Sequence, residues 1–253
     1  MEFRMGGNGP PLLLLQGIDD GFERLPFHDG LAGSFRVLLP SLPGFGRSEL
    51  PKWIESVDDL AYFLLDLLET LKLGPLSVLG AGFSGWIAAE MAVRCQDHLS
   101  CLVLVDAFGI KISEPWVRDI ADIFVLTHEE LAHLAWHDPA AAKEVKVPGT
   151  PGLSQEDLLE SLRRRQTVHM LGWRPFMHNP QLRRRLARIK VPTLVLWGES
   201  DRVVSPDCGR AYHQAILGSQ FKTIPRAGHY PHRERPEEFV RAVTEFLLSK
   251  KDP

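Results

Sequence analysis

The sequence lacks the features that mark secreted, membrane-spanning and nucleic-acid-binding proteins. Its three cysteines, Cys95, Cys101 and Cys208, show neither a disulfide framework nor metal-binding spacing, which favours a reducing compartment, and we expect the cytoplasm. The apolar run Leu12–Leu15 is far too short for a membrane span or a signal core. A net charge of −3 gives no bulk attraction to nucleic acid or to an anionic membrane, so we expect neither as a partner.

Short apolar runs instead alternate with amphipathic helical patterns along the 253 residues. The runs predicted as strands are Leu12–Leu15, Phe35–Leu39, Leu76–Leu79, Cys101–Val105, Thr193–Trp197 and Phe221–Ile224. The predicted helices are Val57–Leu71, Ser84–Cys95, Pro206–Ile216 and Pro236–Leu248. Strands that are apolar throughout are typical of a parallel sheet covered on both faces. The alternation predicts an α/β fold with a mostly parallel sheet flanked by helices.

One stretch, residues 111–190, interrupts this alternation. It holds helical patterns and several prolines, without a convincing strand. Its arginine runs at 163–165 and 183–185 are interpreted as solvated helix faces. We therefore predict an inserted helical cap at 111–190, and a core formed by residues 1–110 and 191–253.

A glycine-rich turn links a strand to a helix near residue 82, and it admits two interpretations. Gly80, Gly82 and Gly85 fit the G-x-G-x-x-G pattern of dinucleotide-binding domains, with Asp106 near the offset of a ribose contact. The same turn is similar to the nucleophile elbow G-x-S-x-G of serine hydrolases. The preferred alignment places Gly82 in the nucleophile position, because the strand then leads directly into the turn. The alternative alignment makes Ser84 the nucleophile.

The chain as a whole resembles the α/β-hydrolase superfamily, in the branch with a helical cap. The resemblance spans nearly the whole chain, and its landmarks occur in the expected order: Leu12–Gly17, Leu42–Ser48, the glycine-rich turn, Leu196–Val204 and Gly228–Pro231. Two departures stand out, because Gln16 replaces the usual histidine and Gly82 replaces the serine. The ordered set favours the hydrolase fold over a dinucleotide domain.

The resemblance also implies the roles of individual residues. Asp201 and His229 form a carboxylate–imidazole dyad in which His229 serves as a base. The backbone N–H groups of Ile18 and Phe83 form an oxyanion hole. We expect the substrate pocket to include Ile18, Gly82, Phe83 and Ser84. No cofactor is implied.

Histidines are frequent in the predicted cap. His133 and His137 stand four residues apart and can share one helix face. No third ligand is evident nearby, and His128-Glu129 followed by His133 misses the H-E-x-x-H zinc spacing by one residue. We therefore expect no metal site.

The favoured function is an enzyme acting on a small, largely apolar carbonyl-type substrate without a serine nucleophile. Three alternatives stay open: a conventional serine hydrolase using Ser84, a non-catalytic ligand-binding relative, and a dinucleotide binder at Gly80–Gly85. Each takes a small molecule as its substrate or ligand. The sequence predicts neither the substrate nor the oligomeric state.

Overall fold

A computed structural model describes residues 1–20, 24–144, 148, 150 and 152–250. Seven strands form one sheet: β1 (Phe3–Gly6), β2 (Pro11–Leu15), β3 (Arg36–Pro40), β4 (Leu76–Ala81), β5 (Leu99–Val105), β6 (Thr193–Gly198) and β7 (Gln220–Ile224). Their order is β1-β3-β2-β4-β5-β6-β7, and every neighbouring pair is parallel except β1 with β3. The parallel order brings the carboxyl ends of strands β2, β4, β5, β6 and β7 to the same edge of the sheet.

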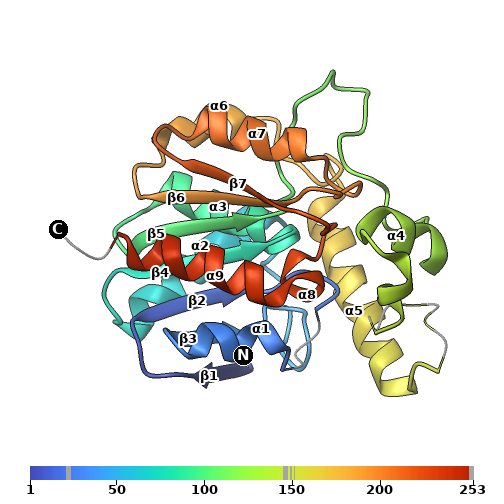
Figure 1. The fold of residues 1–253 in the computed structure, drawn as a ribbon, viewed down its shortest axis with the longest axis horizontal. Coiled ribbons are helices and arrows are strands. Elements are labelled where there is room, and N and C mark those ends of the chain that lie inside the picture. The colour runs from blue at the N-terminus through green and yellow to red at the C-terminus, as the bar shows by residue number, and fades with distance from the viewer. Residues whose placement is uncertain (21–23, 145–147, 149, 151, 251–253) are drawn as a thin grey trace.

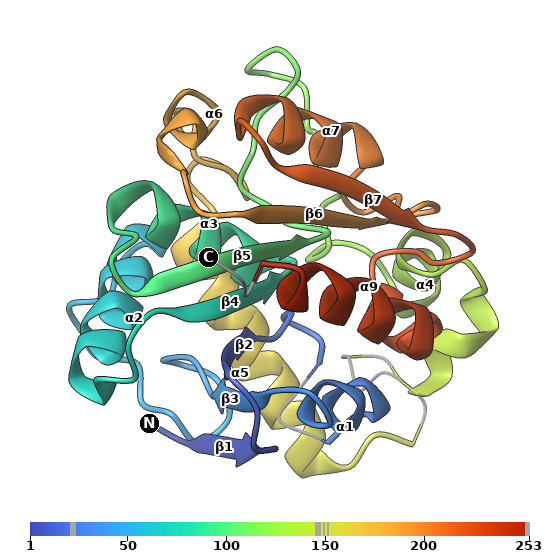
Figure 2. The same cartoon turned by 60° about the vertical axis from the view of Figure 1, so that its left-hand side comes forward.

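Helices cover both faces of the sheet (Figures 1 and 2). The helical elements are α1 (Pro26–Ala32), α2 (Val57–Leu71), α3 (Phe83–Arg94), α4 (His128–Ala135), η1 (Pro139–Glu144), α5 (Gln155–Gly172), α6 (Leu182–Arg185), η2 (Leu186–Arg188), α7 (Pro206–Ala215), α8 (Pro231–Glu234) and α9 (Pro236–Leu248). The predicted α/β architecture is confirmed.

The alternation of side chains along the central strands produces two apolar cores. Leu13 and Leu15 of β2 point into the core beneath α2, α3 and α7, whereas Leu12 and Leu14 point into the core beneath α1 and α9. All four are at most 1% exposed. Burial on both faces explains why β2 reads as a continuous apolar run.

The described elements between residues 111 and 190 are helical. Helices α4 and α5 lie together at one end of the sheet, where Figure 1 shows them beside α8. Short helices α6 and η2 lie elsewhere, because they pack against α7, and η2 also contacts α3. The division into a core and a cap at 111–190 stays a prediction. The helices α6 and η2, near the end of the predicted cap, pack against helices of the predicted core.

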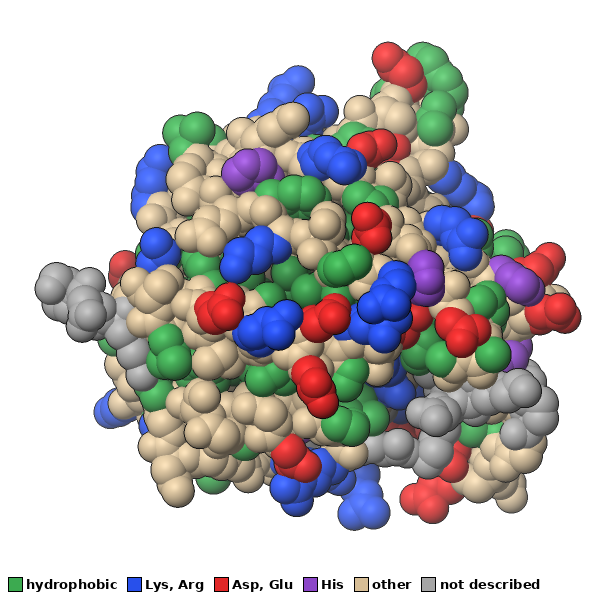
Figure 3. Space-filling model, viewed as in Figure 1, with side chains coloured by type: hydrophobic (Ala, Val, Ile, Leu, Met, Phe, Trp, Pro, Cys, Tyr) green, Lys and Arg blue, Asp and Glu red, His purple; other side chains and the backbone are tan. Residues whose placement is uncertain are grey.

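Acidic and basic side chains are interspersed on the face shown in Figure 3, in keeping with the small net charge. Among the described residues, no helix has the length and hydropathy needed to cross a membrane.

Candidate functional site

Gly82 forms the turn between β4 and α3, and its backbone is unusual. Its φ of 54° and ψ of −120° lie where residues with a side chain are strained. The turn is fixed from both sides, because Gly82 N–H donates to Val105 O at 2.9 Å and Gly82 O accepts from Phe108 N–H at 3.0 Å. The strand ends at Ala81 and the helix begins at Phe83, so Gly82 lies at the turn between them.

The missing side chain of Gly82 points toward His229. Apart from chain neighbours and the helix itself, an ideal Cβ on Gly82 has only His229 atoms within 4 Å among the described residues: Nε2 at 3.3 Å and Cε1 at 3.8 Å. A reactive atom attached to such a Cβ would lie within hydrogen-bonding reach of the ring.

The other ring nitrogen of His229 is paired with Asp201, as the sequence predicts. Nδ1 of His229 lies 2.8 Å from Oδ2 of Asp201, and both side chains are almost completely buried. The second oxygen of Asp201 accepts from the N–H groups of Val203 and Val204, at 2.8 and 3.0 Å. The carboxylate is therefore fixed by the backbone that follows β6, and it holds the imidazole with Nε2 facing Gly82.

The aromatic ring of Phe108 supports the imidazole from one side. The two rings stack with centroids 5.4 Å apart and planes 22° apart. Backbone atoms hold Phe108 itself, because its N–H binds Gly82 O and its carbonyl accepts from the Tyr212 hydroxyl at 2.5 Å. The same segment thus positions both the turn and the imidazole.

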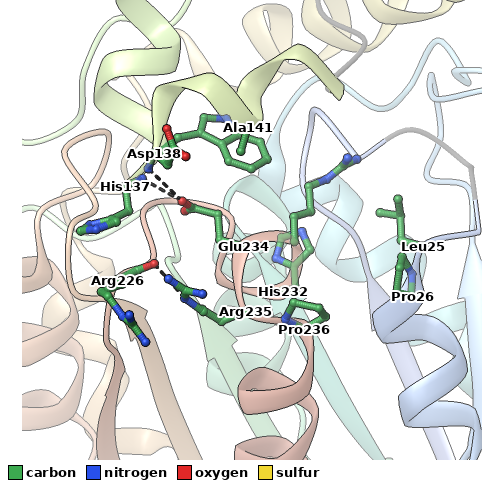
Figure 4. Close-up of a pocket in the computed structure, with 12 residues that line it drawn as sticks. Leu25, Pro26, His137, Asp138, Ala141, Arg226, His232, Glu234, Arg235 and Pro236 are labelled. Carbon is green, nitrogen blue, oxygen red and sulfur yellow. Dashed lines mark hydrogen bonds between the residues drawn. The ribbon is translucent and has the colours of Figure 1, made fainter.

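The loop carrying His229 is anchored to the end of α4 and to the segment that follows it. His229 N–H donates to Ala135 O at 2.6 Å, and Gly228 lies so close to that carbonyl that a Cβ would overlap it. Glu234 adds a second link, because its carboxylate accepts from the N–H groups of His137 and Asp138 (Figure 4). The same carboxylate also accepts from Gly228 N–H at 2.6 Å. Glu234 lines a surface pocket of about 300 Å³ whose walls include neither Gly82, Asp201 nor His229. That pocket therefore lies outside the candidate site.

The loop after β2 faces the histidine loop and is held by buried polar contacts. Tyr230 donates its hydroxyl to Asp19 at 2.6 Å, and burial beside this carboxylate raises the pKa of Tyr230 well above its usual value. The Asp20 carboxylate accepts from Gly17 N–H at 3.0 Å and contacts His232 and Arg233 at 2.9 and 2.8 Å. Burial alone would raise the pKa of Asp20, but His232 and Arg233 lower it well below its ordinary value.

The peptide at Ile18 is tied to α5 as well. Its carbonyl accepts from Nε of the buried Arg164 at 2.9 Å. Among the described residues, the N–H groups of Ile18 and Phe83 have no hydrogen-bond partner. Phe83 is the first residue of α3, where N–H groups lack an intrahelical acceptor and favour negative charge. Neither N–H group is therefore engaged by another described residue.

Ser84 does not join the side chains facing Gly82. It is completely buried, and its hydroxyl donates to Gln16 O at 2.5 Å. The physical reason is its place in the first turn of α3, where the helix directs it toward β2. This contact argues against both the nucleophile role and the substrate contact expected for Ser84.

Asp106 is equally remote from the ribose contact considered in the sequence. It is fully buried after β5, where its Oδ1 accepts from Gly198 N–H at 2.8 Å. Because this carboxylate is buried and binds the backbone of β6, it does not present an exposed acceptor for a ribose, and the dinucleotide interpretation gains no support.

No metal site was expected from the cap histidines. Of these, His137 contacts the Ser200 hydroxyl through its ring Nδ1 at 2.8 Å. Among the described residues, the one close group of three potential ligands is Asp106, Asp201 and His229. The ring and carboxylate atoms through which His229 and Asp201 would bind an ion already bind each other.

A family model for the alpha/beta hydrolase family matches residues 12–242. The chain belongs to the alpha/beta hydrolase family. It is 28% identical to the 2-hydroxy-6-oxononadienedioate/2-hydroxy-6-oxononatrienedioate hydrolase of Burkholderia vietnamiensis, covering 96% of this chain and 88% of the relative. It is 25% identical to the 2-hydroxy-6-oxo-2,4-heptadienoate hydrolase of Pseudomonas putida, over 96% and 91%.

Solved structures show the same fold. A bacterial membrane phospholipase A is similar with a TM-score of 0.80 and 25% identity, over 99% of this chain and 83% of that one. A meta-cleavage product hydrolase has a TM-score of 0.73 at 20% identity, over 98% and 94%. Sequence analysis did not reveal the residues that contact the dyad or its loops, namely Phe108, Glu234, Asp19 and Tyr230, nor that Asp106 lies beside the dyad.

One of these residues had a usable signal. Asp106 directly follows β5, and Asp201 follows the neighbouring β6, in which Val105 pairs with Leu196. Residues after adjacent parallel strands meet at the same edge of a sheet. The strand pattern thus contained a signal for the place of Asp106 beside the dyad, although the sequence analysis considered Asp106 only as a ribose contact.

Proposed function

We propose that this alpha/beta hydrolase is an enzyme that acts on a small, largely apolar carbonyl compound through the His229–Asp201 dyad, without a serine nucleophile. The observation that carries the proposal is the geometry at Gly82. The position of its missing Cβ lies 3.3 Å from His229 Nε2, while Nδ1 is held by Asp201 at 2.8 Å. The base and its orienting carboxylate are thus in place where the attacking side chain is absent.

In this proposal the nucleophile is water bound beside Gly82. His229 Nε2 takes one proton from the water as its oxygen forms a bond to the carbonyl carbon. The carbonyl electron pair moves to oxygen, and the N–H groups of Ile18 and Phe83 stabilise the negative charge. The adduct then collapses: the carbonyl re-forms, the bond between its carbon and the leaving atom breaks, and the leaving atom keeps that electron pair and takes the proton from His229.

The surroundings support base and oxyanion chemistry, because they exclude bulk solvent. Ile18, Phe83 and Phe108 are at most 3% exposed, and His229 is 6% exposed. Electrostatic stabilisation is stronger in such a site than in water. A positioned general base contributes about 10²–10⁴-fold, and each oxyanion donor contributes about 10²–10³-fold.

The relatives suggest the substrate class. The Burkholderia vietnamiensis and Pseudomonas putida relatives are hydrolases of 2-hydroxy-6-oxo acids, which carry an enol and a ketone on one carbon chain. We propose a ketone or ester of this size as the substrate. The free thiols of Cys95, Cys101 and Cys208 accord with the proposed cytoplasmic location.

The test is turnover of a conjugated 2-hydroxy-6-oxo dienoate, followed by loss of its absorbance, beside hydrolysis of p-nitrophenyl acetate. His229→Gln should lower kcat about 10²–10⁴-fold for the accepted substrate, because the base is lost. Ser84→Ala is the matched control and should retain turnover. Equal activity of wild type and His229→Gln would refute the proposal.

Gly82 also favours a second candidate, a ligand-binding relative without catalysis, because the covalent nucleophile of serine hydrolases is missing. This candidate predicts saturable binding of the dienoate with no turnover in wild type. Titration by calorimetry beside the kinetic assay separates the two.

A further inference from the structure

A second carboxyl group, that of Asp106, lies directly behind the dyad. Ligand-type atoms of Asp106, Asp201 and His229 all lie within 4.8 Å of one another, and all three residues are buried. Two carboxylates this close cannot both stay ionised without strong repulsion. The arrangement therefore raises the question of which carboxyl group holds a proton.

The hydrogen bonds around the two carboxyl groups answer this question. Within the described part of the chain, Asp201 has three donors, because its oxygens accept from Val203 N–H, Val204 N–H and His229. Asp106 has one donor there, from Gly198 N–H to Oδ1, and no described residue pairs with its buried Oδ2. Donors stabilise an ionised carboxylate, whereas a proton on Oδ2 would turn the unpaired oxygen into a donor.

We propose that Asp106 is a neutral carboxylic acid in the folded enzyme, and that its Oδ2–H donates to Asp201 and positions the charge of the dyad. Asp106 is thus a positioning residue that acts on His229 through Asp201. Its neutrality is independent of the proposed function, whereas its influence on turnover rests on that function.

Burial and the neighbouring negative charges also favour the protonated form of Asp106. Burial is the largest cause that raises the pKa of Asp106, followed by the negative charge of Asp201 and, more weakly, that of Glu234. The N–H group of Gly198 opposes them. His229 is the remaining titratable group of the cluster, and it faces Asp201.

The consequence for His229 follows from the number of charges behind it. With Asp106 neutral, one negative charge, that of Asp201, lies behind the imidazole. With Asp106 ionised, two negative charges would favour the protonated ring, which cannot accept a proton. The proton on Asp106 therefore removes one of the two charges that would favour protonation of the ring.

Infrared difference spectroscopy of the full chain at pH 7 tests the proposal. Asp106→Asn keeps the acceptor for Gly198 and supplies an N–H toward Asp201, so it should fold and should remove one protonated-carboxyl C=O band. Asp119→Asn is the control, because bonds from Lys111 and Ser113 outweigh burial and lower the pKa of Asp119. This control should leave the band in place. A wild-type spectrum without the band, or a band that survives in Asp106→Asn, would overturn the proposal.

Nitrogen-15 NMR of the His229 ring supplies the functional readout without any substrate. Asp106→Asn exchanges one neutral donor for another, so the ring should titrate as in wild type. A curve displaced by about one pH unit or more toward acid would show that an ionised Asp106 had been lost, which contradicts the proposal.

Asp106→Leu removes the donor to Asp201, so the pH profile of kcat should move toward alkaline pH. An unmoved profile would contradict the positioning role. Should Asp106→Leu fail to fold, infrared and NMR data on Asp106→Asn still decide. Absence of turnover in wild type would count against the proposed function and leave the protonation result intact.

Discussion

Replacing Gly82 by serine tests how completely the rest of a serine hydrolase site is assembled. The new Cβ would lie 3.3 Å from His229 Nε2, so the ring must move by a few tenths of an ångström. The hydroxyl would then lie beside a base already oriented by Asp201. Gly82→Ser should therefore create a nucleophile that forms an acyl-enzyme with activated esters.

The expected magnitudes follow from the turn and from the chemistry. Loss of the nucleophile or base from a serine hydrolase costs about 10⁶-fold, leaving about 10³–10⁴-fold from the remaining site. Restoring one member should thus raise p-nitrophenyl acetate hydrolysis by at least about 10³-fold. A side chain at φ 54° carries strain of about 1–3 kcal/mol. Each kcal/mol lowers Tm by about 2–4 °C in a chain of this size.

The matched control is Gly82→Ala, which carries the same Cβ and the same strain without a hydroxyl. Burst kinetics and labelling by a fluorophosphonate, mapped by peptide mass spectrometry, report the new nucleophile. Gly82→Ser should show a stoichiometric burst and label, whereas Gly82→Ala should show neither. Identical behaviour of the two folded variants would refute the inferred alignment of turn, base and oxyanion donors.

Three further variants probe the neighbouring contacts. Ser84→Ala should remain active and unlabelled by the fluorophosphonate. Its free energy of unfolding, measured by urea denaturation, should fall by about 1 kcal/mol, because only the bond to Gln16 O is removed. Tyr230→Phe should lose about 1–3 kcal/mol in the same assay and show reduced kcat, since Asp19 loses a buried donor beside the Ile18 loop; wild-type stability would contradict this. Burial lowers the pKa of His28 from 6.5 to about 4. The neutral ring therefore contributes to the free energy of unfolding above pH 6.5, and this contribution is lost as the pH falls toward 4. Between pH 7 and pH 4, the free energy of unfolding of His28→Asn should therefore fall by about 3 kcal/mol less than that of wild type. Parallel curves of unfolding free energy against pH would exclude this contribution of His28.

Much of the fold was predictable because burial on both faces of the sheet leaves a direct mark in the sequence. The predicted boundaries of Val57–Leu71 and Pro236–Leu248 match α2 and α9. Strand β1 was missed because Phe3–Gly6 is short, mostly exposed and lies at the sheet edge. Helix α1 was missed because it contains Gly30 and begins after Leu25, which offers no polar cap.

The site was predictable where a residue's role follows from its place after a strand, and less so where packing decides. Asp201 and His229 lie in separate loops that the parallel strands bring to one edge, and they meet as predicted. The burial of Ser84 against Gln16 depends on how α3 packs beside β2, which local patterns do not reveal. The proposed protonation state of Asp106 depends on three segments at once, because Gly198, Asp201 and the end of β5 surround its carboxyl group.

The most direct test of the central claim, catalysis by His229 without a covalent serine intermediate, is the intact mass of the enzyme quenched during turnover. Wild type consuming its substrate should retain its unmodified mass at every quench time, while Gly82→Ser treated with p-nitrophenyl acetate should gain one acetyl group as the positive control. An acyl adduct on wild type that maps to Ser84, or to any other side chain, would contradict the account.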